Sequence, residues 1–293
     1  MSDNSNPQPP ALDKAKARRS FSRAADDYDD AAVLQHEIGR RMIERLDTMR
    51  IQPQRILDIG CGTGVATDGL LKRYPKADVI ALDFALPMLA HARKRGRWLR
   101  RPRCVCADLD QLPLADQCVD LVFANAALQW STNPPAAFAG IARVLRPGGL
   151  LLFSSFGPDT LKELRAAWQA VDGLPHVHGF VDMHDYGDML MHAGLADPVM
   201  DVERMTLTYA DAMPLMREIK IIGAGNASAE RQRGLLGRGR IAEVCAAYER
   251  FRDPDGRLPV SYEVVHGHAW AADQHRSGDE TRVSVDVLRR SRS

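Results

Sequence analysis

The sequence of 293 residues lacks the features of several specialised protein classes. It has no apolar run near the ~18 residues that a transmembrane helix needs. Its first residues, MSDNSNPQPPALDK, contain no apolar segment of the kind found in secretion signals. It also lacks an excess of charge, because Lys+Arg 39 balances Asp+Glu 38, so no overall field favours nucleic acid. We therefore expect a globular protein of the cytoplasm.

Cysteine is scarce, and its spacing does not suit a metal site. The five cysteines stand at positions 61, 104, 106, 118 and 245. Cys104 and Cys106 are separated by one residue, and no second pair has zinc-site spacing. His176 and His178 form another close pair, but no acids accompany them, so a loop is the better interpretation. The sequence predicts no metal site, and thiols in a reducing compartment.

Hydrophobic periodicity divides the chain into segments. Leu34, Ile38, Met42 and Leu46 recur every four residues, which predicts a helical arm over residues 13–50. The next segment, 51–157, alternates apolar runs at 55–59, 78–82, 103–106, 119–124 and 150–156 with helical patterns at about 64–73, 86–95 and 135–145. Runs that are apolar on both faces predict a mostly parallel sheet covered on both sides, an α/β fold.

The later part of the chain is expected to be mostly helical. Residues 158–258 are predicted to form a helical cap insertion, with a late core strand near 199–208. A final strand at 259–270 brings the sheet to seven strands, and polar tails are expected at 1–12 and 271–293. Ligands of α/β sheets bind at the carboxyl ends of the strands, so the cap is expected to cover that edge.

Three glycines follow the first predicted strand, in LDIGCGTG. A phosphate-binding Walker loop would end in Gly-Lys-Ser or Gly-Lys-Thr, which is absent. A dinucleotide fingerprint would need glycine at the position of Val65. The third interpretation is an S-adenosylmethionine loop, in which Asp58 precedes Gly60 and provides a carboxylate for a cofactor that has an ammonium and a sulfonium but no phosphate. A purely structural turn remains the alternative.

Polar side chains also end the next three predicted strands. Asp83 lies about twenty residues beyond the loop, where an acid can bind two ribose hydroxyls. Asp108 and Leu109 follow the third strand and could meet the adenine amine and ring, while Asn125 follows the fourth. Each could be a helix cap or turn residue if taken alone. Together, four strand ends in register predict a nucleoside site.

Residues 55–156 resemble a class I S-adenosylmethionine-dependent methyltransferase. The stretches LDIGCGTG, ALD, ADLDQLP and VLRPGG stand in the order that this family uses. The resemblance implies a Rossmann-like fold and S-adenosylmethionine as the cofactor. The residues implied as its binding site are Asp58, Gly60, Cys61, Gly62, Gly64, Asp83, Phe84, Met88, Asp108, Leu109 and Asn125.

A second resemblance, over about residues 17–270, concerns the arm and the cap. The stretches RRSFSRAADDYDDAAVLQHEIGRRM, ANAALQW, MREIKIIGAGNAS and FRDPDGRLPVSYEVVHGHAW resemble the malonyl-acyl-carrier-protein O-methyltransferases of biotin synthesis. This implies methyl transfer to the free carboxylate of malonyl-acyl carrier protein, or of malonyl-coenzyme A, at the start of pimeloyl synthesis. The ester hides a charge whose burial is costly. A carboxylate is already ionised, so the reaction needs alignment and exclusion of water rather than a base.

The matching segments suggest acceptor-site residues, each with a structural alternative. Tyr28 is expected on the arm over the cofactor, although it could be a packing tyrosine. Gln129 and Trp130 are expected beside the transferred methyl, although Trp130 could be a core residue. Arg217 could pair with the thioester carbonyl or the carboxylate, and Lys220 on the same helix is the second choice. Both could equally be solvated helix charges.

An acidic carrier protein should dock on a basic surface. The chain offers HARKRGRWLRRPR at 91–103 and, in the predicted cap, Arg231, Arg233, Arg238 and Arg240. We favour the second set because the cap flanks the mouth of the site, while a solvated face is the alternative for both. The runner-up functions are methylation of another small acid or a quinone, and a non-catalytic cofactor-binding assembly factor.

Overall fold

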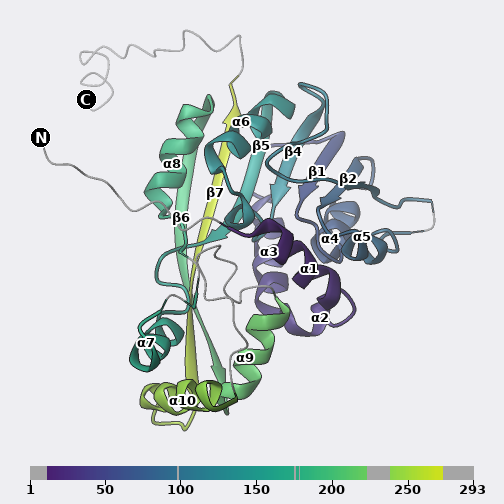
Figure 1. Ribbon diagram of the computed structural model, residues 1–293. Helices are drawn as coiled ribbons and strands as arrows, with labels where there is room; N and C mark the ends of the chain where they lie inside the picture. Colours follow the sequence, from purple (N-terminus) through teal and green to yellow (C-terminus); the bar gives the residue numbers. More distant parts are fainter. Residues whose placement is uncertain (1–11, 98, 175, 178, 223–237, 273–293) are drawn as a thin grey trace, which may run out of the picture.

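Seven strands form a single sheet in the order β3-β2-β1-β4-β5-β7-β6 (Figure 1). The computed structural model describes residues 12–97, 99–174, 176–177, 179–222 and 238–272. The strands are β1 (Arg55–Ile59), β2 (Asp78–Asp83), β3 (Arg103–Cys106), β4 (Val119–Ala124), β5 (Leu145–Phe156), β6 (Leu195–Tyr209) and β7 (Leu258–Ala271). Only β7 runs antiparallel to its neighbours, so the predicted mostly parallel α/β sheet is confirmed.

The helices fall into an arm, the crossover connections of the sheet and a later group. The arm contains α1 (Lys14–Ala24), α2 (Tyr28–Ala31) and α3 (Val33–Arg45). The connections contain α4 (Val65–Arg73), α5 (Leu86–Ala92), the short η1 (Leu128–Trp130) and α6 (Pro134–Val144). The later group contains α7 (Lys162–Val171), α8 (Met183–His192), α9 (Ala212–Ile221), α10 (Arg238–Tyr248) and η2 (Glu249–Phe251).

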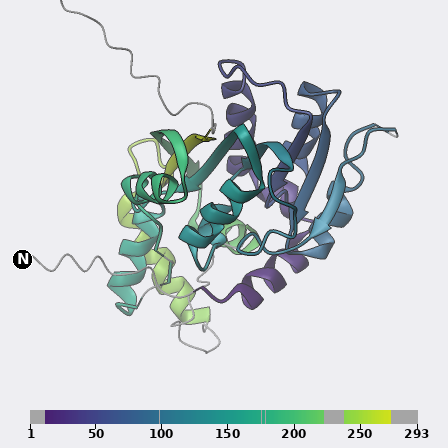
Figure 2. The same ribbon diagram turned by 90° about the horizontal axis from the view of Figure 1, so that it is seen from above.

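Both faces of the central part of the sheet are covered, which explains why β1, β4 and most of β5 are buried on both sides. In β1, Ile56 joins the cluster beneath α3 and α4, whereas Leu57 and Ile59 join the cluster that contains Phe138 of α6 and Tyr186 of α8. Figure 2 shows the early strands in blue at one end of the sheet and the late green and yellow strands at the other. The strand order reverses between β1 and β4, and the topology places a ligand crevice at that point.

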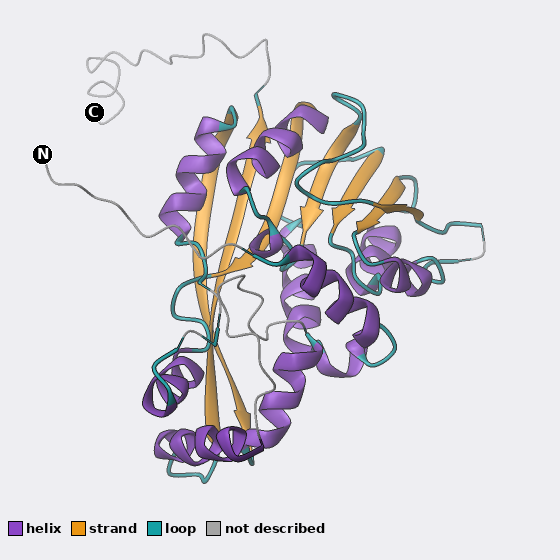
Figure 3. Ribbon diagram, viewed as in Figure 1, coloured by secondary structure: helices purple, strands orange, loops and turns teal. Residues whose placement is uncertain are grey.

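The last two strands are longer than the sequence pattern predicts. They pair from Leu195 with Ala271 to Tyr209 with Leu258, beyond the predicted limits of 199–208 and 259–270. Figure 3 shows this hairpin extending past the other strands, with α7 and α10 around its far end. The hairpin is therefore both the edge of the core sheet and the scaffold of the cap.

The segment 158–258, predicted as a cap insertion, is divided between two places. α8 packs against β6 and α6, and its Tyr186 and Leu190 are fully buried in the core beside the sheet. α7 and α10 instead pack against each other at the extended hairpin. Helical periodicity marks an apolar face but does not tell which partner covers it, so α8 could not be separated from the cap beforehand.

The arm is part of the folded body. Leu34, Ile38, Met42 and Leu46 are all buried in the cluster against β1, β4 and β5, which confirms the apolar stripe. α1 also contacts α5 and α9, so the arm reaches both the core and the cap. The predicted tails lie almost entirely outside the described residues, and no described helix is long and apolar enough to cross a membrane.

Candidate active site

The glycine loop turns the chain from β1 into α4. Gly60, Gly62 and Gly64 have φ angles of 65, 54 and 82°, in the region where only glycine is unstrained. A Cβ on Gly60 would lie 2.6 Å from the Cβ of Ala127, and one on Gly64 would lie 2.8 Å from the Cα of Ala92. The loop therefore requires glycine both for its turns and for close packing.

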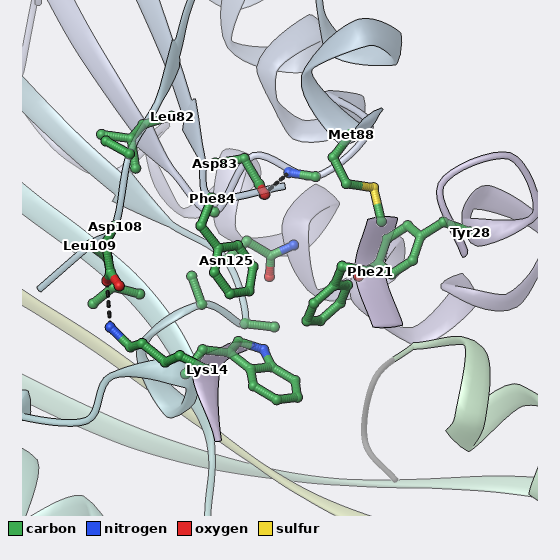
Figure 4. Close-up of a pocket in the computed structure, with 16 residues that line it drawn as sticks. Lys14, Phe21, Tyr28, Leu82, Asp83, Phe84, Met88, Asp108, Leu109 and Asn125 are labelled. Carbon is green, nitrogen blue, oxygen red and sulfur yellow. Dashed lines mark hydrogen bonds and ion pairs between the residues drawn. The ribbon is translucent and has the colours of Figure 1, made fainter. Parts of the chain in front are cut away.

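A cavity with about 590 Å³ of empty volume opens beside this loop, at the carboxyl ends of the strands (Figure 4). It is lined by Lys14, Phe21, Tyr28, Gly60, Gly62, Leu82, Asp83, Phe84, Met88, Ala107, Asp108, Leu109, Asn125, Ala126, Ala127 and Trp130. Most of the residues predicted to bind the cofactor are therefore brought together.

Asp83 presents a buried carboxylate to the cavity. It ends β2, is 6% exposed, and accepts hydrogen bonds from the backbone N–H groups of Gly62 (3.0 Å) and Ala85 (2.8 Å). Burial raises the pKa of Asp83 to about 6, against the opposing effect of these N–H groups. A carboxylate has about four acceptor positions, so two donors leave room for two ligand hydroxyls.

Lys14 connects the arm to the end of β3. Its ammonium forms ion pairs with Asp108 and Asp110, and Figure 4 shows it reaching Asp108 at the cavity edge. Asp110 also accepts hydrogen bonds from Ser131 and Thr132 after β4. The arm is thereby fixed across two strand ends. Lys14 was not predicted from the sequence, because a lysine in a polar helix gives no signal of a contact so distant along the chain.

A second connection holds the arm over the glycine loop. The carboxylate of Asp29 accepts hydrogen bonds from the Thr63 hydroxyl and from the Arg95 guanidinium (2.6 Å). Arg95 also donates to the backbone oxygen of Thr63 (3.0 Å). These contacts cover the loop with the arm and reduce the access of water to it.

Three predicted cofactor ligands are not among the residues that line the cavity. Asp58 is 1% exposed and accepts a 2.5 Å hydrogen bond from Thr67 of α4. Cys61 packs with Leu89, and Gly64 begins α4. They are not in the lining and help to shape the loop, so direct contact of these three residues with a cofactor stays a prediction.

The Asp58–Thr67 pair provides a test of this supporting role. Burial raises the pKa of Asp58 to about 7, whereas the Thr67 hydroxyl favours the ionised form. Thr67→Val should therefore lower the free energy of unfolding by about 1–3 kcal/mol above pH 7. The loss should shrink below the pKa, where the carboxyl is protonated. Denaturant unfolding at several pH values measures this, and a loss that does not change with pH would contradict it.

Three aromatic side chains form a wall between the cavity beside the glycine loop and a second cavity. Phe21 lies edge-on to Trp130 with ring centroids 5.0 Å apart, and Tyr28 lies 6.1 Å from Phe21. All three residues line both cavities. Burial and the nearby Asp83 raise the pKa of Tyr28, so its phenol is neutral at physiological pH. Tyr28 and Trp130 thus lie between the two cavities, and their contacts with the cofactor and the transferred methyl stay predictions.

The second cavity has about 410 Å³ of empty volume and lies between the arm, the sheet and the cap. It is lined by Phe21, Tyr28, Gln35, Ala126, Gln129, Trp130, Phe156, Thr160, Leu161, Phe180, Ile222 and Tyr262. Gln129 lines it as expected, donating to the Ala126 carbonyl (2.6 Å). The ionisable members of this lining are Tyr28 and Tyr262, and burial raises the pKa of each. The described lining is therefore uncharged at neutral pH.

Arg217 and Lys220 do not line either cavity. Both are exposed on α9, whose buried residues are Ala212, Leu215 and Ile219. The helical repeat places 217 and 220 away from that buried face. Contact between Arg217 and the acceptor therefore stays a prediction. Ile222, just after the helix, lines the cavity instead.

The two basic segments differ in what the structure shows of them. In the segment 91–103, His91, Arg95 and Arg103 contact Asp26, Asp29 and Asp78, respectively, within 3.1 Å. In the cap set, Arg231 and Arg233 lie outside the described residues, as does the side chain of Arg238. Arg240 lies 3.5 Å from Asp172 and is 44% exposed.

Comparisons with known proteins agree with this geometry. Residues 57–153 match the family described as a methyltransferase domain. A malonyl-[acyl-carrier protein] O-methyltransferase of Halorhodospira halophila is 50% identical over 287 residues, covering 96% of this chain and 97% of that protein. One of Laribacter hongkongensis is 52% identical over 284 residues, covering 94% and 95%.

Solved structures with low sequence identity share the fold. The YcgJ protein of Bacillus subtilis superposes with a TM-score of 0.57 at 16% identity, over 81% of this chain and 99% of its own. An S-adenosylmethionine-dependent methyltransferase of Thermotoga maritima gives 0.52 at 16% identity, over 87% and 99%. With the curated relatives matched over nearly their whole length, the chain belongs to the malonyl-[acyl-carrier protein] O-methyltransferase family, within the class I S-adenosylmethionine-dependent methyltransferases.

Proposed function

We propose that this enzyme transfers the methyl group of S-adenosylmethionine to the free carboxylate of malonyl-acyl carrier protein or malonyl-coenzyme A. The observation that carries the proposal is a pair of adjoining cavities that share Phe21, Tyr28 and Trp130. One is lined by the strand-end residues Asp83, Asp108 and Asn125, and the described lining of the other is uncharged. The malonyl acceptor follows from the names of relatives about 50% identical. The product is the malonyl methyl ester that starts pimeloyl synthesis for biotin.

The residues of the larger cavity fit S-adenosylmethionine. The buried Asp83 has acceptor positions for the two ribose hydroxyls, and Asp108 with Leu109 would hold the adenine. Gly60 and Gly62 allow the backbone to approach the cofactor closely. When bound, the cofactor supplies an electrophilic methyl group on a positively charged sulfur. The wall of Phe21, Tyr28 and Trp130 offers π faces, which attract cations.

The chain needs no general base for this reaction. A malonyl carboxylate is ionised at neutral pH, so one of its oxygens can attack the methyl carbon without losing a proton. The arm and the aromatic wall exclude water and bring the two partners into line. Opposite charges on the partners are lost as the bond forms, so an uncharged cavity favours the transition state over the separated ions.

Incubation with methyl-labelled S-adenosylmethionine and three acceptors tests the proposal. Malonyl-acyl carrier protein, malonyl-coenzyme A and free malonate are compared in parallel, and the methyl ester is identified by mass spectrometry. We expect ester on at least one malonyl thioester. Label on none of the three would overturn the assignment. S-adenosylhomocysteine without methylated acceptor would indicate only slow cofactor hydrolysis.

We propose docking of the acidic carrier on Arg231 and Arg233, with Arg238 and Arg240 nearby in the sequence. The charge reversals Arg231→Glu and Arg233→Glu together should raise KM for malonyl-acyl carrier protein about tenfold or more at low salt. The effect should fade as salt screens the surface charges. KM for malonyl-coenzyme A, which lacks the carrier surface, is the control, and an equal increase for both acceptors would place docking elsewhere.

A further inference from the structure

Gln35 lies in the smaller of the two cavities, and the oxygen of its buried side-chain amide has no described hydrogen-bond partner. It lies on α3, is 9% exposed, and lines the smaller cavity. No described group donates a hydrogen bond to its buried Oε1 atom. Its backbone oxygen accepts from the Asn125 side chain at 2.8 Å, which fixes the position of the residue. Buried polar groups are nearly always hydrogen-bonded, so an exception in the lining of a cavity points to a ligand.

Two other polar side chains of this cavity, Gln129 and Thr160, are already hydrogen-bonded within the protein. Gln129 donates to the Ala126 carbonyl at 2.6 Å, and its Oε1 accepts from Ser155 at 3.4 Å. The Thr160 hydroxyl donates to the backbone oxygen of Glu263 and accepts from its N–H. Of the two amides in the lining, therefore, Gln129 is tied to the fold and Gln35 is available to a ligand.

The charge of the smaller cavity determines which kind of side chain can orient an anionic acceptor there. Its described lining contains no lysine, arginine or histidine, and Tyr28 and Tyr262 are neutral because burial raises the pKa of each. An anionic acceptor must therefore be oriented by neutral donors. Because no donor holds the oxygen of Gln35, the terminal amide can turn about its last torsion and present its N–H group.

We propose that the side-chain amide of Gln35 binds the acceptor carboxylate through an N–H donor. This rests on the function proposed above. One carboxylate oxygen accepts from Gln35, and the other forms the C–O bond as the S–CH3 bond breaks and its electron pair returns to sulfur. No proton moves. An arginine would stabilise the ionised acceptor more than the transition state, in which that charge is being lost, whereas an amide orients the carboxylate with less of this penalty.

Two variants of the full-length enzyme test the role of Gln35. Gln35→Leu should lower kcat/KM for malonyl-coenzyme A about 10- to 100-fold, mainly through KM, because a hydrogen bond to a charged group is lost. Gln35→Glu, of nearly the same shape, should lower it at least about 100-fold at about pH 8, where two anions would meet. Relative to wild type, the activity of Gln35→Glu should recover at about pH 6 as the introduced carboxyl takes up a proton.

Stability and cofactor binding separate this role from a structural one. The melting temperature of Gln35→Leu should equal or exceed that of wild type, because the variant removes an unsatisfied buried oxygen. S-adenosylhomocysteine affinity should stay within about threefold of wild type, since Gln35 is not in the lining of the larger cavity. The exposed Gln169→Glu on α7 serves as the matched charge control and should behave like wild type.

The outcomes distinguish the inference from the proposed function. An inactive wild type with every malonyl acceptor overturns both. An active wild type whose Gln35→Leu variant keeps its KM overturns the role of Gln35 alone. So does a loss in Gln35→Glu that is the same at every pH and follows a lowered melting temperature, because that is the pattern of a packing defect. If Gln35→Leu does not fold, the pH profile of Gln35→Glu decides.

Discussion

Asp83→Asn should weaken S-adenosylmethionine binding about 100-fold or more. The carboxylate already accepts from Gly62 and Ala85, and the proposed ribose contacts add two bonds to a charged acceptor. Each such bond is worth about 1.5–3 kcal/mol, and about 1.4 kcal/mol corresponds to a factor of ten. The amide also places an N–H group where an acceptor is required. Isothermal titration with S-adenosylmethionine and with S-adenosylhomocysteine measures the loss.

Asp78→Asn is the matched control, because Asp78 begins the same strand and contacts the exposed Arg103 at 3.1 Å. It should leave cofactor affinity unchanged. An equal loss in both variants would mean that β2 has been disturbed and that Asp83 has no special role.

The pH dependence of cofactor binding gives an independent test of Asp83. Burial raises its pKa to about 6 in the ligand-free protein, and the proposed ribose contacts require the ionised form. Affinity for S-adenosylhomocysteine should therefore be full above this pKa and fall as the pH decreases through about 6. Asp83→Asn should lose this dependence. Burial also raises the pKa of Asp58, to about 7. The variant Asp58→Asn removes this second titrating carboxyl and so shows how much of the pH dependence comes from it. A wild-type affinity that is flat between about pH 5 and 8 would contradict the assignment.

Gly60→Ala should abolish measurable cofactor binding and destabilise the protein by about 2–4 kcal/mol. The residue has a φ of 65°, where a side chain is strained, and the new Cβ would lie 2.6 Å from the Cβ of Ala127. Relief of this overlap would move the loop or the segment after β4, and both line the cofactor cavity. Denaturant unfolding and cofactor titration measure the two effects.

Two control variants separate backbone strain from the collision. Gly148→Ala introduces the same substitution at a φ of 72°, where no atom lies within 4 Å, and should cost only about 1 kcal/mol with normal cofactor affinity. The double variant Gly60→Ala with Ala127→Gly removes the overlap and should recover much of the lost binding. Failure of the double variant to recover any binding would show that the strained loop, and not the contact with Ala127, is responsible.

The cofactor side of the site was largely predictable from local sequence. Asp83, Asp108 and Asn125 each follow an apolar run that could only be a strand, and parallel strands bring their carboxyl ends to one edge. Strand period and topology therefore determine that these residues meet. The three glycines of LDIGCGTG likewise indicated a tight turn, which their positive φ angles confirm.

The acceptor side was less predictable because it depends on packing between distant segments. Arg217 and Lys220 have suitable chemistry, but the phase of α9 leaves them exposed. Packing also matters on the cofactor side, where the carboxylate of Asp58 accepts a hydrogen bond from Thr67 and is not part of the cavity lining. Gln35 was part of the arm that carried the family resemblance, and nothing in its neighbours marked it as a buried, unpartnered amide.

Local sequence was enough to predict the parallel α/β core, the glycine loop and the row of strand-end residues, because these follow from local periodicity and from the geometry of parallel strands. The side chains that enclose the acceptor depend instead on the tertiary fold. That cavity is built where α1, α2 and α3 meet the cap and the extended β6–β7 hairpin. Contacts between segments so far apart in the chain depend on how the helices are oriented and packed, and residue patterns do not predict this.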